Sequence, residues 1–319
     1  MLFLNKTDIA GLDRTLIQGA VRRAYSLMLD NDYNMPDRIH VHDKDNTFLL
    51  MPCFSGAYLA TKLVSVFPGA AQKGLPVVNG VMILNDNETG QPLAFMDGAA
   101  LTAERTGAVG GLGVDLLTPR DITRAGIFGA GVQSRSQVRY LLLNRPVQQV
   151  AIADLHKPAV TAMIQELSKE FPKINFVPAS SPESLVEEAE VIIAATTTKV
   201  PLFRNDPGLV KGKTFISIGS FLPDMKEFPD AVIEGAAQVF VDTPFAAKES
   251  GDICQPLAQG KVALEKIQPF ASLLRTPVSP NEMTTLFFKS VGMALFDLCA
   301  SVAVYEAALT GKLGKVLDF

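Results

Sequence analysis

The second half of this chain alternates short, almost wholly apolar runs with stretches of helical periodicity. Strands that are apolar throughout are typical of sheets covered on both faces, and helical connections between them make the strands parallel. Helices are expected after Gly131, over 157–171 and from Ser181-Pro182. The pattern predicts a doubly wound, Rossmann-type α/β domain with strands AGIFGA (125–130), VAIAD (150–154), INFVP (174–178), VIIAAT (191–196), TFISIG (214–219) and VFVDT (239–243).

The first 120 residues have a different pattern, in which β-type runs are separated by turn signals. One helix is expected over about 12–30 and another from the capping-box-like Thr102 onwards. The proline-free segment 281–313 is expected to be one long or broken helix that packs back on this first part. The runs RIHVH (38–42), TFLLMP (47–52), ATKLVSVFP (60–68), VVNGVMILND (77–86) and PLAFMD (92–97) predict an antiparallel sheet.

Composition excludes several classes of protein. Lysine and arginine total 29 and aspartate and glutamate 33, so the net charge of −4 offers no basic field for nucleic acid. The three cysteines are far apart and form no CxxC pair, which argues against a disulfide framework or a structural zinc. His40 and His42 stand two apart without further ligands, so no metal is expected. With no leader and no apolar stretch of about 18 residues, we expect a cytoplasmic protein without a membrane partner.

A glycine-rich turn follows the first strand of the α/β domain. Its pattern, G-x-G-x-x-S, lies between a strand and a helix, as in dinucleotide-binding folds, where pyrophosphate binds at the helix N-terminus. Asp154 ends the next strand, where a carboxylate can bind the ribose diol of NAD. His156 and Lys157 follow at once and leave room for NADP. The expected cofactor-binding residues are Gly129, Gly131, Val132, Gln133, Ser134 and Asp154.

Three basic residues of the first half occupy unusual positions. Arg38 opens a strand, Lys62 interrupts an apolar strand, and Arg105 lies early in a helix. A lysine buried without an anionic partner is costly. From the residues alone, Lys62 is therefore expected on the solvent face.

Several strings together resemble the ornithine cyclodeaminase/mu-crystallin family, in order and over nearly the whole chain. They are PDRIHV, ATKLVSVFPGAAQKGLP, LNDNETGQPLAFMDGAALTAERTGA, IFGAGVQSRSQ, IGSFLPDMKEF and FFKSVGMALFDL. The resemblance implies a substrate-binding and dimerisation domain of residues 1–120 and 299–319, around an NAD(P)-binding domain of residues 121–298. It also implies a homodimer formed through the N-terminal sheets.

The resemblance further implies that an arginine, a lysine and a second arginine hold the substrate's α-carboxylate. These fall on Arg38, Lys62 and Arg105, which moves Lys62 from the solvent face into a pocket. Bidentate arginine would fix the orientation of the carboxylate as well as neutralise its charge. The pocket is expected to include Leu49, Met51 and Phe221.

Two of these pocket residues depart from the ornithine cyclodeaminases. Leu49 replaces a glutamate of that family, and Phe221 replaces an aspartate. Neither can transfer the protons that deamination of ornithine requires, whereas reduction of a preformed cyclic imine needs mainly positioning. Asp224 and Glu227 are further candidate acids, or belong to a solvated turn and helix start.

The function expected is NAD(P)H-dependent reduction of a small cyclic ketimine carboxylate, of the Δ1-pyrroline-2-carboxylate or Δ1-piperideine-2-carboxylate type, to the cyclic L-amino acid. Three alternatives stay open. They are ornithine cyclodeaminase, a dehydrogenase of the alanine or opine type, and a nucleotide-dependent small-molecule binding protein of the mu-crystallin type.

Overall fold

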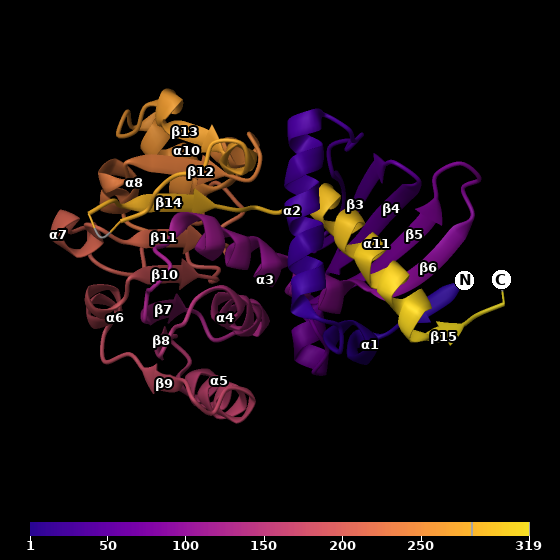
Figure 1. Cartoon of the computed structure of the whole chain (residues 1–319), viewed down its shortest axis with the longest axis horizontal. Coiled ribbons are helices and arrows are strands. Elements are labelled where there is room, and N and C mark those ends of the chain that lie inside the picture. Colours follow the sequence, from indigo (N-terminus) through magenta and orange to yellow (C-terminus); the bar gives the residue numbers. More distant parts are fainter. Residues whose placement is uncertain (282, 319) are drawn as a thin grey trace. The chain divides into compact units, whose positions relative to one another are not determined.

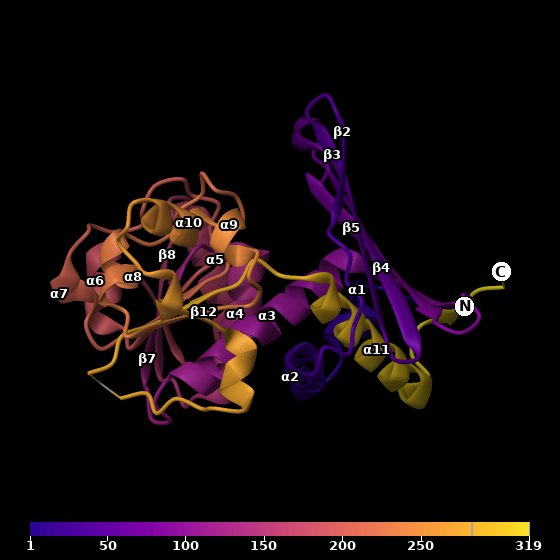
Figure 2. The same cartoon turned by 90° about the horizontal axis from the view of Figure 1, so that it is seen from above.

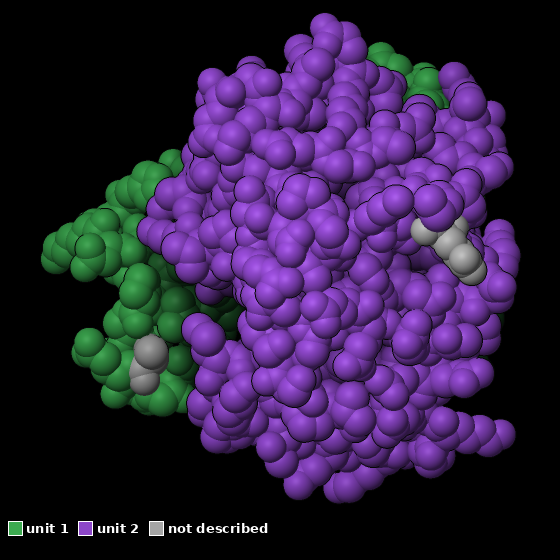
Figure 3. All heavy atoms as spheres, turned by 90° about the vertical axis from the view of Figure 1, so that its left-hand side faces the viewer, with its two compact units in different colours: residues 1–105, 293–319 green, residues 106–292 purple. Residues whose placement is uncertain are grey.

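The computed structural model describes residues 1–281 and 283–318, which form two compact units. Unit 1 comprises Met1–Arg105 and Met293–Phe319, and unit 2 comprises Thr106–Gly292. Figure 3 colours the two units separately.

The described strands of unit 1 form one sheet in the order β15-β1-β6-β5-β4-β3-β2. Its pairs are antiparallel, except that β1 runs parallel to β6. The strands are β1 (Leu2–Leu4), β2 (Ile39–Asp43), β3 (Asn46–Ser55), β4 (Tyr58–Val66), β5 (Val78–Asp86), β6 (Pro92–Asp97) and β15 (Lys315–Val316). The helices are α1 (Lys6–Ala10), α2 (Arg14–Asp30), the 3-10 helix η1 (Pro68–Lys73), the start of α3 (Gly98–Leu117) and α11 (Ala294–Gly311).

Helix α11 covers one face of this sheet and packs in turn against α2 (Figure 2). By length and composition alone α11 could span a bilayer, but most of it is buried within unit 1, as in the core helix of a globular unit. Because side chains alternate across a strand, the cross-strand register places one set of residues on the covered face. This set is Met51, Cys53, Ala60, Lys62, Met82, Leu84, Ala94 and Met96, and every member is buried.

The opposite face of the sheet is also apolar but only partly buried. Ile39, Val41 and Phe48 are exposed there, and Leu50 and Leu63 are half-buried. Exposed apolar side chains gathered on one face are typical of surfaces that bind another molecule.

In unit 2 the described strands form a parallel sheet in the order β13-β12-β14-β11-β10-β7-β8-β9 (Figure 1). This confirms the predicted Rossmann-type α/β architecture. The strands are β7 (Arg124–Phe128), β8 (Gln149–Ala153), β9 (Asn175–Pro178), β10 (Val191–Ala194), β11 (Thr214–Ser217), β12 (Gln238–Val241), β13 (Ile267–Pro269) and β14 (Leu286–Lys289). The helices are α4 (Val132–Asn144), α5 (Lys157–Glu170), α6 (Pro182–Glu188), α7 (Pro207–Val210), α8 (Asp230–Gly235), α9 (Ala246–Glu249), α10 (Gly251–Ala258) and the 3-10 helices η2 (Leu264–Lys266) and η3 (Phe270–Leu274).

Helices lie on both faces of the parallel sheet (Figure 2). On one face, α6, α7 and α8 share a buried cluster with the strands, built around Phe128, Phe215 and Phe287. On the other face, the second half of α3 lies against β11 and β14. A Cβ atom at Gly113 would come within 2.8 Å of the Phe288 ring.

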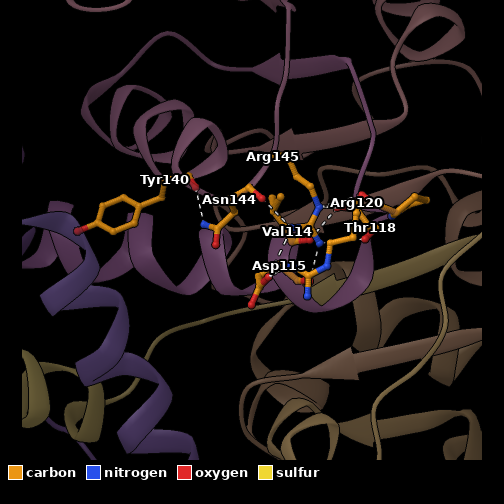
Figure 4. Close-up of polar contacts among 8 residues, drawn as sticks. Val114, Asp115, Thr118, Arg120, Tyr140, Asn144 and Arg145 are labelled. Carbon is orange, nitrogen blue, oxygen red and sulfur yellow. Dashed lines mark hydrogen bonds and ion pairs between the residues drawn. The ribbon is translucent and has the colours of Figure 1, made fainter.

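Arg145 closes the C-terminal end of α3 (Figure 4). Its guanidinium donates to the backbone oxygens of Asp115 (2.6 Å), Thr118 (3.0 Å) and Pro119 (2.8 Å). The last carbonyls of a helix lack intrahelical partners. This buried arginine therefore satisfies them and ties the end of α3 to the end of α4.

Two predicted boundaries are wrong. Helix α3 begins at Gly98 rather than near Thr102, because the Asp97 side chain accepts the Ala100 N–H and starts the helix earlier. The predicted helix over 281–313, of which residue 282 lies outside the described residues, is a strand followed by a helix. Its first apolar run pairs with β11 and β12 as β14, and Gly292, with φ of +76°, separates β14 from α11.

The unit boundaries at 105/106 and 292/293 differ from the predicted domain boundaries at 120/121 and 298/299. The reason is that most of α3 packs with the parallel sheet and α4, where Gly107 and Gly110 leave no room for a side chain beside Tyr140 and Gln137. Strand β14 likewise belongs to that sheet, and α11 begins directly after it.

The start of α3 rests on the backbone of β5. A Cβ atom at Gly98 would lie 2.7 Å from the Gly80 carbonyl carbon and the Val81 nitrogen, which cannot move aside. We expect Gly98→Ala to lower the free energy of unfolding by about 1–3 kcal/mol. Gly80→Ala is the matched control, because its Cβ would meet nothing closer than 3.5 Å. Urea denaturation of both variants checks this, and equal stabilities would contradict it.

Candidate active site

Lys62 and Arg105 share one carboxylate in the interior of unit 1. Lys62 Nζ lies 2.7 Å from Asp297 Oδ2, and Arg105 Nε lies 2.9 Å from Asp297 Oδ1. The three side chains come from β4, α3 and α11, and the residues are 4%, 7% and 0% exposed. The structure thus brings together two of the three predicted cations.

This cluster carries more positive than negative charge. Two cations face one anion, and buried charge without compensation is costly. Burial lowers the pKa of Lys62 to about 8, because Asp297 only partly offsets it and Arg105 and Arg38 oppose a further charge. Burial alone would raise the pKa of Asp297, but Arg105 and Lys62 hold it below its ordinary value. The site therefore favours an additional anion.

Arg105 binds Asp297 through Nε alone. In the part of the chain that the structure describes, no hydrogen bond joins its terminal nitrogens to another residue. Those two nitrogens form the fork that binds carboxylates in a bidentate manner. Arg105 can therefore hold Asp297 and a ligand carboxylate at the same time.

Arg38 directly precedes β2. Its neighbour Ile39 pairs with Leu50 of β3, and Leu50 is the neighbour of Met51. Met51 in turn is opposite Lys62. Arg38 is close enough to Lys62 to lower its pKa, and Met51 is buried on the same sheet face as Lys62. Leu49 lies on the same face, two residues from Met51, and is half-buried.

Phe221 belongs to unit 2, in the loop after β11, and is 45% exposed. Neither its position nor that of Leu49 carries a carboxylate, as the sequence shows.

Sequence reasoning missed Asp297. The apolar pattern of its helix indicates simple core packing, and the sequence alone suggests a site without a carboxylate. A signal was present, because Asp297 is a single carboxylate within the apolar run ALFDLCASVAVY. Aspartate is almost never fully buried unless it is paired. Together with a lysine inside an apolar strand, it could have indicated a buried ion pair.

The glycine turn of unit 2 has the geometry that the sequence predicts. Gly129 has φ of +100°, a region that favours glycine. Gly131 precedes α4 with no side-chain cap, and a Cβ on it would meet nothing within 4 Å. The N-terminus of this helix therefore presents its backbone N–H groups beside an open backbone, as a phosphate requires.

Two buried polar atoms at this turn lack protein partners. Gln133 Oε1 and Ser134 Oγ make no hydrogen bond within the described residues. Buried polar groups in native proteins are nearly always satisfied. These atoms fit a site whose remaining partner is a bound nucleotide.

Asp154 closes the other side of the turn. Its Oδ2 accepts the Ala130 N–H at 2.7 Å and its Oδ1 accepts the His156 N–H at 2.8 Å. Each oxygen keeps a second lone pair, so the anchored carboxylate can still accept a ribose hydroxyl. His156 and Lys157 are exposed directly after it.

The remaining candidate acids differ in position. Asp224 is exposed and paired with Lys199 at 2.6 Å. Glu227 is fully buried and accepts bonds from Thr196, Ser217, Gly219 and Ser220, so its interpretation as part of a solvated helix start is wrong.

His40 and His42 stack at 6.0 Å on β2. Among the described residues no group of three or more histidine, cysteine, aspartate or glutamate side chains could hold a metal.

Known proteins resemble this chain over most of its length. Δ1-Pyrroline-2-carboxylate reductase of Bacillus cereus is 30% identical over 87% of this chain and 86% of its own. Alanine dehydrogenase of Archaeoglobus fulgidus is 28% identical, over 94% and 92%. The structure of Thermococcus litoralis Δ1-pyrroline-2-carboxylate reductase with NADH and L-proline superposes with a TM-score of 0.92 at 29% identity, covering 99% of this chain and 100% of that one. The model of the ornithine cyclodeaminase/mu-crystallin family matches residues 9–312, and the chain belongs to this family.

Proposed function

We propose that this protein reduces a small cyclic ketimine carboxylate, of the Δ1-pyrroline-2-carboxylate class, with NADH. The observation that supports this most strongly is the buried cluster in which Lys62 and Arg105 share Asp297, because its excess positive charge selects an anionic head group. The similarity to reductases that bear this name supports the same substrate class.

The substrate carboxylate is bound by the cation cluster. Arg105 offers its two terminal nitrogens, Lys62 keeps two of its three N–H donors, and Arg38 adds charge from the strand edge. Asp297 holds Lys62 and Arg105 in place through its two oxygens. A bound carboxylate therefore neutralises the cluster and fixes the orientation of the ring.

Reduction of the imine requires a hydride at carbon and a proton at nitrogen. Bound NADH supplies the hydride. Lys62 is the candidate proton donor, since burial lowers its pKa to about 8, where an ammonium gives up its proton more readily than an ordinary lysine. Asp297 accepts a hydrogen bond from the same ammonium and keeps it oriented.

Leu49 and Phe221 favour this substrate over ornithine. A second amine must be deprotonated during cyclodeamination, and neither side chain can take a proton. Each of the two side chains is apolar and offers no partner to a charged amine.

The glycine turn and Asp154 form the proposed nucleotide site. Gly129, Gly131 and the N–H groups of Val132, Gln133 and Ser134 would hold the pyrophosphate, and Asp154 the adenosine ribose. A carboxylate at this position repels a 2′-phosphate, so we assign NADH as the preferred nucleotide.

We also assign the enzyme to the cytoplasm. Cys53, Cys254 and Cys299 are all free, and Cys53 and Cys299 are buried, which suits a reducing compartment.

A homodimer accounts for the apolar face of the unit 1 sheet that α11 leaves uncovered. Phe48 is opposite Val41 on that face, and both are exposed. A second copy of the same sheet would cover this surface in a two-fold interface, the commonest symmetry of homo-oligomers.

Purified protein is expected to oxidise NADH when Δ1-pyrroline-2-carboxylate is added, and to do so less efficiently with NADPH. Absorbance at the nicotinamide band measures both rates. Pyruvate with ammonia tests the alanine dehydrogenase activity of the relative, and ornithine with NAD tests cyclodeamination. Turnover with either of these, and none with the cyclic imine, would contradict the assignment.

The value of kcat/KM is expected to fall as pH rises through about 8, because Lys62 loses its charge there. Asp297→Asn removes the anion that raises the pKa of Lys62, so the fall should move to lower pH. In Lys62→Arg the guanidinium stays charged, so this fall should disappear from whatever activity remains. Glu306→Gln, an exposed change on the same helix, is the control. A profile that is identical in all four proteins would contradict this role.

Light scattering after gel filtration is expected to give twice the chain mass of 34.3 kDa. Phe48→Glu should shift the protein toward monomer, because it buries a charge in the proposed interface. Leu264→Glu alters an exposed apolar residue elsewhere and should leave the mass unchanged. A monomeric wild type, or a variant Phe48→Glu that stays dimeric, would contradict the interface.

A further inference from the structure

Glu227 is a fully buried carboxylate in unit 2 that the proposed reaction does not use. Its Oε1 accepts the Thr196 N–H at 2.6 Å and the Thr196 hydroxyl at 2.9 Å. Its Oε2 accepts the N–H groups of Gly219 (2.8 Å) and Ser220 (3.2 Å). One carboxylate thus joins the loop after β10 to the loop after β11.

These two loops touch each other so closely that only glycine fits. A Cβ atom at Gly219 would lie 2.0 Å from the Thr196 oxygen and 2.3 Å from its nitrogen. On the other side, a Cβ at Gly129 would lie 2.8 Å from the Ala195 oxygen. Ala195 and Thr196 are therefore held between the glycine turn and the loop after β11.

This point is the topological switch of the sheet. The chain proceeds from β7 outward to β8 and β9, and then returns to the other side of β7 as β10. In doubly wound sheets a dinucleotide lies across the crevice at this reversal, outside the carboxyl ends of the strands. If the glycine turn after β7 holds the pyrophosphate and Asp154 after β8 the adenosine ribose, the loops after β10 and β11 are the ones that would hold the nicotinamide half.

A second buried carboxylate fixes Glu227 itself. Asp252 accepts the Glu227 N–H at 2.9 Å, and its other oxygen faces the Ser217 hydroxyl at 2.8 Å. The same Ser217 hydroxyl lies 2.7 Å from Glu227 Oε2, and it accepts a hydrogen bond from the Lys289 ammonium at 2.8 Å. Among the described residues, none of these four side chains has a buried polar atom without a partner. A fully satisfied network of this kind makes its members rigid.

We propose that Glu227 is a positioning residue for the nicotinamide half of the cofactor. It fixes Thr196 and Gly219 at the wall of the crevice where that half binds, while the adenosine half depends on the glycine turn and Asp154. This inference rests on the proposed use of NADH. It predicts that altering Glu227 affects the two halves of the cofactor differently.

Replacing the carboxylate by an amide tests this difference. In Glu227→Gln an NH2 group, which only donates, replaces one of the two acceptor oxygens. This group must then face the N–H groups of one of the two loops. The dissociation constant for NADH, followed by its fluorescence, should rise at least tenfold. The dissociation constant for ADP-ribose, which lacks nicotinamide, should stay within twofold by calorimetry, and kcat should fall.

Asp242→Asn is the matched control. Asp242 is equally buried in unit 2, and one of its oxygens accepts bonds from the Ser290 hydroxyl and the N–H groups of Val291 and Gly292, which belong to the segment after β14 and not to the two loops that Glu227 joins. It should lower the melting temperature without changing the ratio of the two affinities. Where Glu227→Gln does not fold, Thr196→Val removes one of the same bonds and should weaken NADH binding several-fold while sparing ADP-ribose.

An unchanged ratio of affinities in the Glu227 and Thr196 variants would overturn the proposal. So would an equal change in Asp242→Asn, because the effect would then be one of general stability. Wild-type protein that binds neither probe would overturn the nucleotide assignment itself. Wild-type protein that binds both with an altered ratio in Glu227→Gln, but reduces no cyclic imine, would leave this inference standing and contradict only the substrate.

Discussion

One carboxylate, Asp297, holds two cations of unit 1 in the interior of the protein. Without it, Lys62 and Arg105 would be buried like charges with no counter-ion, an arrangement that costs several kcal/mol per ion. With it, the pair is stable but keeps an excess of positive charge. The same ion pairs thus allow Lys62 to lie on the sheet face that α11 covers, and their excess positive charge is the basis of the proposed anion binding.

Reduction of a cyclic imine requires few chemical steps from the protein. An imine that already has its ring closed needs its carboxylate held, its nitrogen protonated and its carbon presented to the cofactor. In the proposed reaction Lys62 both binds the carboxylate and protonates the nitrogen, since burial lowers its pKa to about 8. In unit 2, the buried Glu227 and Asp252 accept hydrogen bonds from backbone N–H groups of the loops and hold them in place.

The sequence predicted the regular parts well, for identifiable reasons. The buried strands of unit 2 are apolar throughout, so their positions, the glycine turn and Asp154 follow from local patterns. The run from Leu286 to Lys289 is predicted as helix because nothing local distinguishes a short buried strand from a buried helix; its pairing with β11 and β12 is a long-range property. Asp297 and Glu227 were missed or undervalued for a related reason. The partners of Asp297 lie 192 and 235 residues away, and Glu227 draws its partners from two loops that only the sheet brings together.

We propose that the cation cluster binds the substrate through the charge of its carboxylate. Calorimetric titration of the protein–NADH complex with pyrrole-2-carboxylate and with pyrrole-2-carboxamide tests it most directly, because the two ligands share a flat ring and differ in head-group charge. Charge-assisted hydrogen bonds contribute about 1.5–3 kcal/mol each, so the carboxylate should bind at least about tenfold more tightly than the amide. Equal affinities would show that the charge of the head group is not what the site recognises.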